Sequence, residues 1–167
     1  MSIIRKLNQK IISRHPNVFN KNQKIDFNWE EQKHITGKRK SRLDGVPKKL
    51  SALIRAHRLQ QKASETGFDW TNVEPVINKV YEEIKELEAA ISSGDQKKIE
   101  EEFGDALFSM VNLSRHLELS SENALRKSNN KFIARFKKLE KKIARKGKKF
   151  EELTHAEMDK IWEKVKY

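Results

Sequence analysis

The middle of the chain carries two pairs of carboxylates with the same spacing. Glu83 and Glu86 form the first pair, and Glu102 and Asp105 form the second. Residues three apart lie on one face of a helix, so each pair predicts a helix that presents two carboxylates side by side. Four carboxylates that converge on one spot repel each other unless a cation neutralises them. Because ligands made only of oxygen favour a hard divalent ion, the pattern predicts a Mg²⁺ site in which Mn²⁺ can substitute.

The second pair lies in a stretch that breaks two rules for a stable helix. Glu101 and Asp105 are like charges one turn apart, which costs about 0.2–0.5 kcal/mol, and Gly104 costs roughly 1 kcal/mol relative to alanine. The alternative interpretation of either pair is a solvated acidic face, because such spacings are common on helix surfaces. Two pairs on consecutive predicted helices, with these penalties beside the apolar Phe103, favour a functional site instead.

Two lysines lie one helical turn before these carboxylates. Lys79 precedes Glu83 by four residues, and Lys98 precedes Glu102 by four. Each lysine is therefore predicted to project from the same helix face as a carboxylate, where an ammonium group binds phosphate well. The alternative for each is a surface salt bridge or a solvated side chain, the usual state of helical lysine.

Further candidates for substrate binding lie near the C-terminus. Lys131 and Arg135 are one turn apart in a basic stretch, and Trp162 offers a ring that can stack on a base. The alternative for the tryptophan is a place in the core, where a helical tryptophan is more often found.

Charge is unevenly distributed along the chain. The net charge is +12 overall, while residues 63–125 carry 5 Lys/Arg and 14 Asp/Glu, and residues 126–149 carry 12 and 1. Carboxylates that hold cations next to basic groups that hold phosphates would give this pattern. A helical module that binds nucleic acid non-specifically explains the basic blocks equally well, but not the paired acids.

Several classes of protein are disfavoured by the composition. The chain has no cysteine, which excludes disulfides, thiolate metal sites and a cysteine nucleophile. No apolar run reaches about 18 residues, and no secretory signal is visible, so we expect a cytoplasmic protein without a membrane partner. Glu152-x-x-His155 is a single motif of its kind, whereas a di-iron bundle needs two. A glycine-rich phosphate loop is also absent, so side chains and metal would hold phosphates.

Helical periodicity dominates the chain, and strand-like alternation is scarce. Helices are predicted over 2–13, 51–65, from 72 to a turn at 91–95, from 96 to about 117, over 121–146 and from 154 to about 165. Thr71 with Glu74, and Thr154 with Glu157, fit capping boxes. The predicted buried rows are Val73, Ile77, Val80, Ile84, Leu87 and Ile91; Ile99, Phe103, Ala106, Leu107, Met110, Val111 and Leu117; and Leu125, Phe132, Phe136, Leu139 and Ile143. The predicted fold class is all-α, an antiparallel helical bundle.

The order of these motifs resembles the MazG family of all-α nucleoside triphosphate pyrophosphohydrolases. The signature is Glu82-Glu83-x-x-Glu86 followed by Glu102-x-x-Asp105. Further matching segments are Arg14-His15-Pro16-Asn17-Val18-Phe19, Gly67-Phe68-Asp69-Trp70, Val111-Asn112-Leu113-Ser114-Arg115-His116-Leu117 and Asn130-Lys131-Phe132. The resemblance spans nearly the whole chain and is closest to that family's C-terminal catalytic half.

The resemblance implies Mg²⁺-dependent cleavage between the α- and β-phosphates of a nucleoside triphosphate. It makes Glu83, Glu86, Glu102 and Asp105 metal ligands. It places Lys79, Lys98, Lys131, Arg135 and Lys166 near the triphosphate and Trp162 near the nucleotide. No side chain is an obvious nucleophile, so water is expected to attack directly, with Glu82 or Glu83 as the proton acceptor and Lys98 as a further catalytic candidate.

The resemblance also implies a division of the chain and an assembly. Residues 1–48 are expected to be a helix and linker that correspond to the end of a preceding repeat, and residues 49–167 the catalytic domain. A homodimer is expected, because the apolar rows are wider than one partner helix can cover. The rival hypotheses are a basic nucleic-acid-binding module, although no specific nucleic acid partner is expected, and a regulatory module without turnover.

Overall fold

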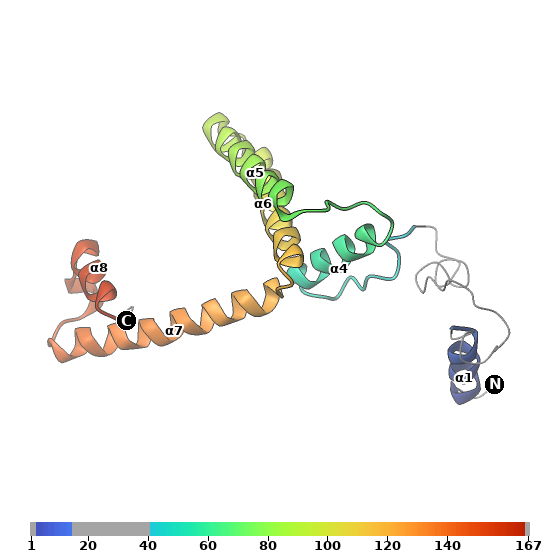
Figure 1. Cartoon of the computed structure of the whole chain (residues 1–167). Helices are drawn as coiled ribbons and strands as arrows, with labels where there is room; N and C mark the ends of the chain where they lie inside the picture. The colour runs from blue at the N-terminus through green and yellow to red at the C-terminus, as the bar shows by residue number, and fades with distance from the viewer. Residues whose placement is uncertain (1–2, 15–40, 166–167) are drawn as a thin grey trace. The chain divides into compact units, whose positions relative to one another are not determined.

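The structure, a computed structural model, describes residues 3–14 and 41–165. Within these ranges it contains only helices: α1 (Ile3–Arg14), α4 (Ala52–Ser64), α5 (Val73–Ser93), α6 (Gln96–His116), α7 (Ser121–Arg145), the 3₁₀ helix η1 (Phe150–Glu152) and α8 (His155–Glu163), as Figure 1 shows. The all-α prediction is confirmed. Lys166 and the linker at residues 15–40 lie outside the described residues.

The chain divides into two compact units, residues 1–112 and residues 113–167. The boundary that the sequence suggested at residue 48 stays a prediction.

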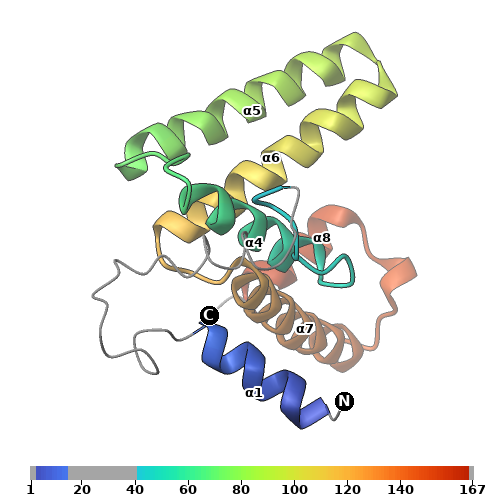
Figure 2. The ribbon, with the colours of Figure 1, turned by 90° about the vertical axis from the view of Figure 1, so that its right-hand side faces the viewer.

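Helices α5 and α6 form an antiparallel hairpin in the first unit (Figure 2). Gly94 ends α5 in the left-handed conformation, with φ of 70°, which glycine adopts without steric cost. Asp95 then starts α6, because its Oδ1 accepts hydrogen bonds from the backbone N–H groups of Lys97 and Lys98 at 3.1 and 3.3 Å. The predicted tight turn is therefore confirmed at Gly94 and Asp95, whereas residues 91–93 belong to α5. The turn fixes which residues of the two helices face each other.

The start of α5 differs from the prediction. The N-cap is Asn72 and it makes no side-chain capping bond, so the capping box predicted for Thr71 and Glu74 is wrong. Pro75 lies in the first turn of α5, where its missing N–H leaves no helical hydrogen bond unmade.

Helix α4 contacts α6 through a buried amide. Gln60 is 7% exposed, and its Nε2 donates to the backbone carbonyl of Phe108 at 2.8 Å. This bond holds the side of α4 that carries Gln60 against α6.

The first unit buries few of the apolar side chains that were predicted for its core. Ala106 and Val111 of the predicted row on α6 are buried, whereas Phe103, Leu107 and Met110 of the same row are 55%, 47% and 51% exposed. On α5 the buried apolar residues are Val76 and Ala90, which the prediction did not include. Ile84 and Ile91 on α5 are also exposed. The predicted rows exist, but in this chain alone much of their surface faces solvent.

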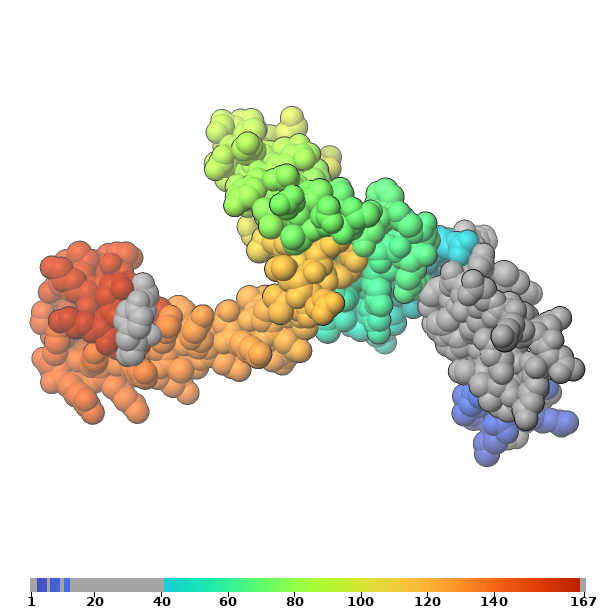
Figure 3. Space-filling view, viewed as in Figure 1, coloured from blue at the N-terminus to red at the C-terminus, as the bar shows by residue number. Residues whose placement is uncertain are grey.

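The second unit has a small apolar core between α7 and α8. The residues that form it are Leu139, Ile143, Leu153, Ile161 and Val165, with Phe150, Met158 and Trp162 packed against them. Helix α8 lies against the C-terminal part of α7 (Figure 3). The predicted capping box is confirmed here, because Thr154 Oγ1 accepts from the Glu157 N–H and Glu157 Oε2 accepts from the Thr154 N–H. The predicted row on α7 is buried at Leu139 and Ile143 but exposed at Leu125, Phe132 and Phe136.

Candidate metal and nucleotide site

Three of the four predicted carboxylates meet where α5 and α6 face each other. Glu83, Glu86 and Glu102 each offer one oxygen, and these oxygens lie within 4.8 Å of one another. Glu83 is buried, Glu102 is half-buried and Glu86 is exposed. The hairpin thus brings together residues that are 19 positions apart in sequence, from Glu83 to Glu102.

Burial and like charge act together on this cluster. The pKa of Glu102 is raised above its usual value, first by burial and then by the negative charges of Glu86 and Asp105. Asp105 lies outside the group of oxygens within 4.8 Å, yet its charge reaches Glu102. The cluster is therefore a site of unbalanced negative charge that favours a cation.

The side chains present fit a hard divalent ion. All three donors are carboxylates, and an ion such as Mg²⁺ or Mn²⁺ prefers oxygen ligands. The cluster opens to solvent at Glu86, so water can complete the coordination of an ion that keeps several of its waters.

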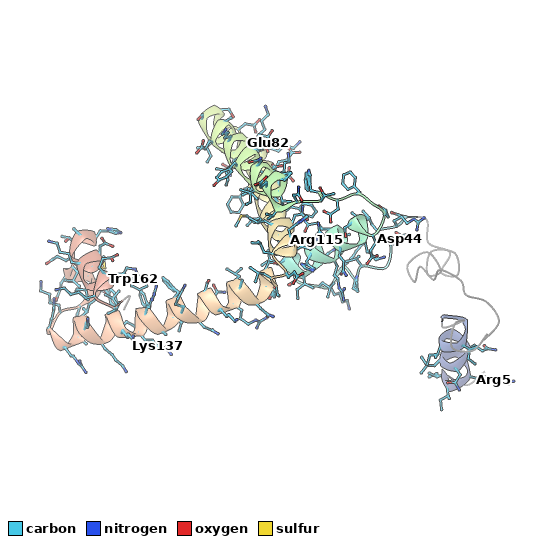
Figure 4. All side chains as sticks on the ribbon, in the orientation of Figure 1. Arg5, Asp44, Glu82, Arg115, Lys137 and Trp162 are labelled. Atoms are coloured by element: carbon cyan, nitrogen blue, oxygen red, sulfur yellow. The ribbon has the colours of Figure 1, made fainter. Side chains whose placement is uncertain are left out.

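Lys79 is already bound to this cluster. Its Nζ lies 2.7 Å from Glu82 Oε1 and 2.8 Å from Glu83 Oε1. The pKa of Lys79 is raised because Glu82 and then Glu83 accept hydrogen bonds from its ammonium group. Glu82, labelled on α5 in Figure 4, thus pairs with Lys79 and is not part of the carboxylate group that converges with α6.

The other predicted phosphate ligands lie in different parts of the chain. Lys98 is exposed in the first turn of α6, one turn before Glu102. Lys131 is exposed on α7, and Arg135, on the next turn of that helix, is half-buried. The structure describes each unit by itself, so the approach of Lys131 and Arg135 to the carboxylates stays a prediction.

Trp162, labelled on α8 in Figure 4, packs partly against the core of the second unit. The ring centroids of Trp162 and Phe132 are 5.5 Å apart, and the rings of Phe132 and Phe136 stack with their centroids 5.9 Å apart. Lys131 and Arg135 lie on either side of Phe132 in sequence. The core interpretation of Trp162 therefore holds in part, because the side chain is half-buried and packs beside Phe132, which is 56% exposed, and its contact with a nucleotide stays a prediction.

One buried polar group was missed by the sequence reasoning. The Oε1 atom of Gln60 is buried and has no hydrogen-bond partner among the described residues, although its Nε2 is bonded to Phe108. A glutamine among the polar residues of α4 carries no sequence signal that distinguishes it from Gln61.

Comparison with known proteins identifies a domain of a known family. Residues 71–140 match the MazG nucleotide pyrophosphohydrolase domain. A protein of Thermotoga maritima named nucleoside triphosphate pyrophosphohydrolase/pyrophosphatase MazG is 46% identical over 167 residues, which is 98% of this chain and 64% of that protein. Residues 71–140 thus carry a MazG nucleotide pyrophosphohydrolase domain, and the chain is similar to MazG over nearly its whole length.

Other relatives support this assignment. A nucleoside triphosphate pyrophosphohydrolase of Escherichia coli is 40% identical over 170 residues, covering 96% of this chain and 65% of the relative. The uncharacterized protein YabN of Bacillus subtilis is 36% identical over 173 residues, covering 98% of the chain and 35% of that protein. The chain thus spans slightly less than two thirds of the two pyrophosphohydrolases. Residues 71–140, which match the MazG domain, contain all five acidic candidates as well as Lys79, Lys98, Lys131 and Arg135. Trp162 lies beyond this domain match.

Within the described residues, none of the helices combines the length and the apolar character needed to cross a membrane.

Proposed function

We propose that this chain hydrolyses nucleoside triphosphates or their deoxy forms to the monophosphate and pyrophosphate, as a nucleotide-pool enzyme. The observation that carries the proposal is the convergence of Glu83, Glu86 and Glu102, beside Lys79, in a chain that carries a MazG domain. The relatives named pyrophosphohydrolases support the same reaction.

Glu83, Glu86, Glu102 and Asp105 would hold Mg²⁺, with Mn²⁺ as a substitute. When bound, the ion neutralises phosphate oxygens and polarises a water molecule. Glu83 is best placed among these to stay fixed, because its carboxylate is buried. Asp105 is included among these ligands for two reasons. Its negative charge raises the pKa of Glu102, and its spacing of three residues from Glu102 puts both side chains on one face of α6.

The basic side chains and the tryptophan would bind the substrate. Lys79, Lys98, Lys131, Arg135 and Lys166 would donate to the triphosphate, and Trp162 would contact the nucleotide. Donors that stabilise charge on the leaving pyrophosphate accelerate the cleavage.

The chemical step is the attack of water on the α-phosphorus. A new oxygen–phosphorus bond forms, the bond from the α-phosphorus to the bridging oxygen breaks, and pyrophosphate leaves. Glu82 or Glu83 would accept the proton of the water. Glu82 is 57% exposed and hydrogen-bonded only through Oε1 to Lys79 among the described contacts, so its second oxygen supports its candidacy.

We also propose that the chain functions as a homodimer. Phe103, Leu107 and Met110 follow one another along α6 at helical spacing and are about half exposed, and a contiguous exposed apolar row of this kind marks an interface. A two-fold dimer is the commonest way in which soluble chains bury such a surface.

The test of the proposed function is an incubation with a panel of ribo- and deoxyribonucleoside triphosphates, with and without Mg²⁺. Chromatographic separation should show monophosphates that depend on Mg²⁺. Diphosphates with orthophosphate as first products would contradict the proposal. No turnover of any triphosphate, together with salt-sensitive binding to DNA or RNA, would favour the basic nucleic-acid-binding alternative.

A further inference from the structure

The ammonium group of Lys79 bridges two neighbouring carboxylates at the edge of the candidate metal site. Its Nζ is 2.8 Å from Glu83 Oε1 and 2.7 Å from Glu82 Oε1. The Glu83 side chain is 8% exposed, whereas those of Glu82 and Lys79 are 57% and 35% exposed. Lys79 therefore supplies positive charge to the carboxylate that has the least access to water and needs a counter-ion most.

We propose that Lys79 is an internal counter-ion that leaves Glu83 for a phosphate when the substrate binds, so that nucleotide and metal promote each other's binding. This inference rests on the proposed function, because it takes Glu83 as a metal ligand and a nucleoside triphosphate as the anion. It goes further in assigning to Lys79 the coupling between the two ligands.

The physical basis is competition for one carboxylate. A divalent ion on Glu83 and an ammonium group 2.8 Å from the same carboxylate repel each other. Without nucleotide, Lys79 thus weakens metal binding. A bound triphosphate offers the ammonium group of Lys79 a more highly charged partner. When the ammonium group leaves Glu83, its repulsion of the divalent ion is removed.

Lys79 has the mobility that this exchange requires. Lysine carries a compact charge with three donors on a flexible four-carbon stem. The side chain is 35% exposed, so it can turn toward a ligand in solvent without breaking the core. Glu82, which is exposed and carries the other half of the bridge, can return to water when Lys79 leaves.

A purely structural role for Lys79 predicts the opposite result. If Lys79 only held Glu83 in its rotamer, its loss would disorder a metal ligand and weaken metal binding. If it is a counter-ion, its loss strengthens metal binding to the nucleotide-free protein. The sign of the change separates the two roles.

The experiment measures Mn²⁺ binding to the full chain by electron paramagnetic resonance, with and without an α,β-methylene triphosphate analogue that cannot be cleaved. The variants are Lys79→Met and Lys79→Gln, with Lys85→Met as the matched control. Lys85 is exposed and follows Glu83 by two residues, so it loses the same charge from α5 but does not share the Glu83 face.

Without nucleotide, Lys79→Met should bind Mn²⁺ about tenfold more tightly than the parent. The factor by which the analogue raises Mn²⁺ affinity should be at least about fivefold smaller in Lys79→Met than in the parent, a change within the usual range of coupling between two ligands. Lys79→Gln should shift both quantities in the same direction, and Lys85→Met should stay within about twofold of the parent in both. Weaker Mn²⁺ binding in both Lys79 variants, or unchanged coupling, would overturn the inference while the metal site stands. A parent protein that binds no Mn²⁺ in either condition would instead overturn the proposed function.

Discussion

Neutralising Glu86 should stabilise the metal-free protein and weaken its binding of metal. Glu86 and Glu83 place carboxylate oxygens within 4.8 Å of each other, and Coulomb's law then gives about 1 kcal/mol of repulsion in bulk water and about 3 kcal/mol at an effective dielectric of 20. Because Glu86 is exposed and Lys79 already offsets part of the charge on Glu83, we take the lower value. A gain of about 1 kcal/mol should raise the Tm of Glu86→Gln by roughly 2–4 °C for a chain of this length.

The metal should respond in the opposite direction. The loss of an outer partner of a metal ligand typically costs about 10–100-fold in affinity, so the loss of a ligand itself should cost at least that much. Glutamine preserves the length and helix propensity of glutamate, so the change isolates the charge. Glu88→Gln is the matched control, because Glu88 is an exposed glutamate on α5 outside the carboxylate cluster.

Thermal unfolding in EDTA and in Mn²⁺ measures both effects. In EDTA, Glu86→Gln should unfold at a higher temperature than the parent protein. In Mn²⁺ it should gain much less stability than the parent, and Glu88→Gln should follow the parent in both buffers. A lower Tm for Glu86→Gln in EDTA would refute the reasoning, because it would show that Glu86 stabilises the fold through contacts and does not strain it.

Three further predictions concern the substrate, the pH and the assembly. Lys131→Ala and Arg135→Ala should each lower kcat/KM roughly 10–150-fold, the equivalent of one charge-assisted hydrogen bond. Steady-state kinetics that match the parent would show that the substituted residue does not bind the substrate. The pKa of Glu157 is lowered by the Thr154 N–H and hydroxyl and by Lys148, so its ionised form stabilises α8 at pH values above about 4.5, its pKa in the unfolded chain. This contribution is lost as the pH falls below that pKa, so the Tm difference between the parent and Glu157→Gln should shrink there. A Tm difference that stays constant with pH would contradict this linkage. Leu107→Glu, a charge placed in the half-exposed row of α6, should lower the mass measured by light scattering at micromolar concentration, whereas a parent that is already a fully active monomer would remove the case for a dimer.

Much of the helical framework could be predicted because its signals are local. Gly94 and Asp95 predict the end of α5 and the start of α6, and the structure confirms both. Thr154 and Glu157 likewise form the predicted capping box. At the start of α5, Thr71 fitted the same pattern, but the helix begins at Val73 with Asn72 as its cap. A capping pattern shows which bonds are possible and does not show which residue leaves the helical conformation.

The packing of the helices could be predicted only in part. Helical spacing correctly grouped Glu83 with Glu86, and the tight turn brought Glu102 to them, because an antiparallel hairpin leaves little freedom in register. The same spacing showed an apolar row through Phe103 and Leu107, but nothing in it states what covers the row. The burial of Gln60, and the bridge from Lys79 to two carboxylates, depend on side-chain positions that periodicity does not determine.

The most direct test of the proposed function is the position of the new oxygen after hydrolysis in ¹⁸O-water. Mass spectrometry of the products of one nucleoside triphosphate, with Mg²⁺ and the full chain, identifies both the bond that breaks and the phosphorus that water attacks. The proposed function predicts a nucleoside monophosphate that carries one ¹⁸O and a pyrophosphate that carries none. A labelled pyrophosphate, or a nucleoside diphosphate with labelled orthophosphate, would contradict it.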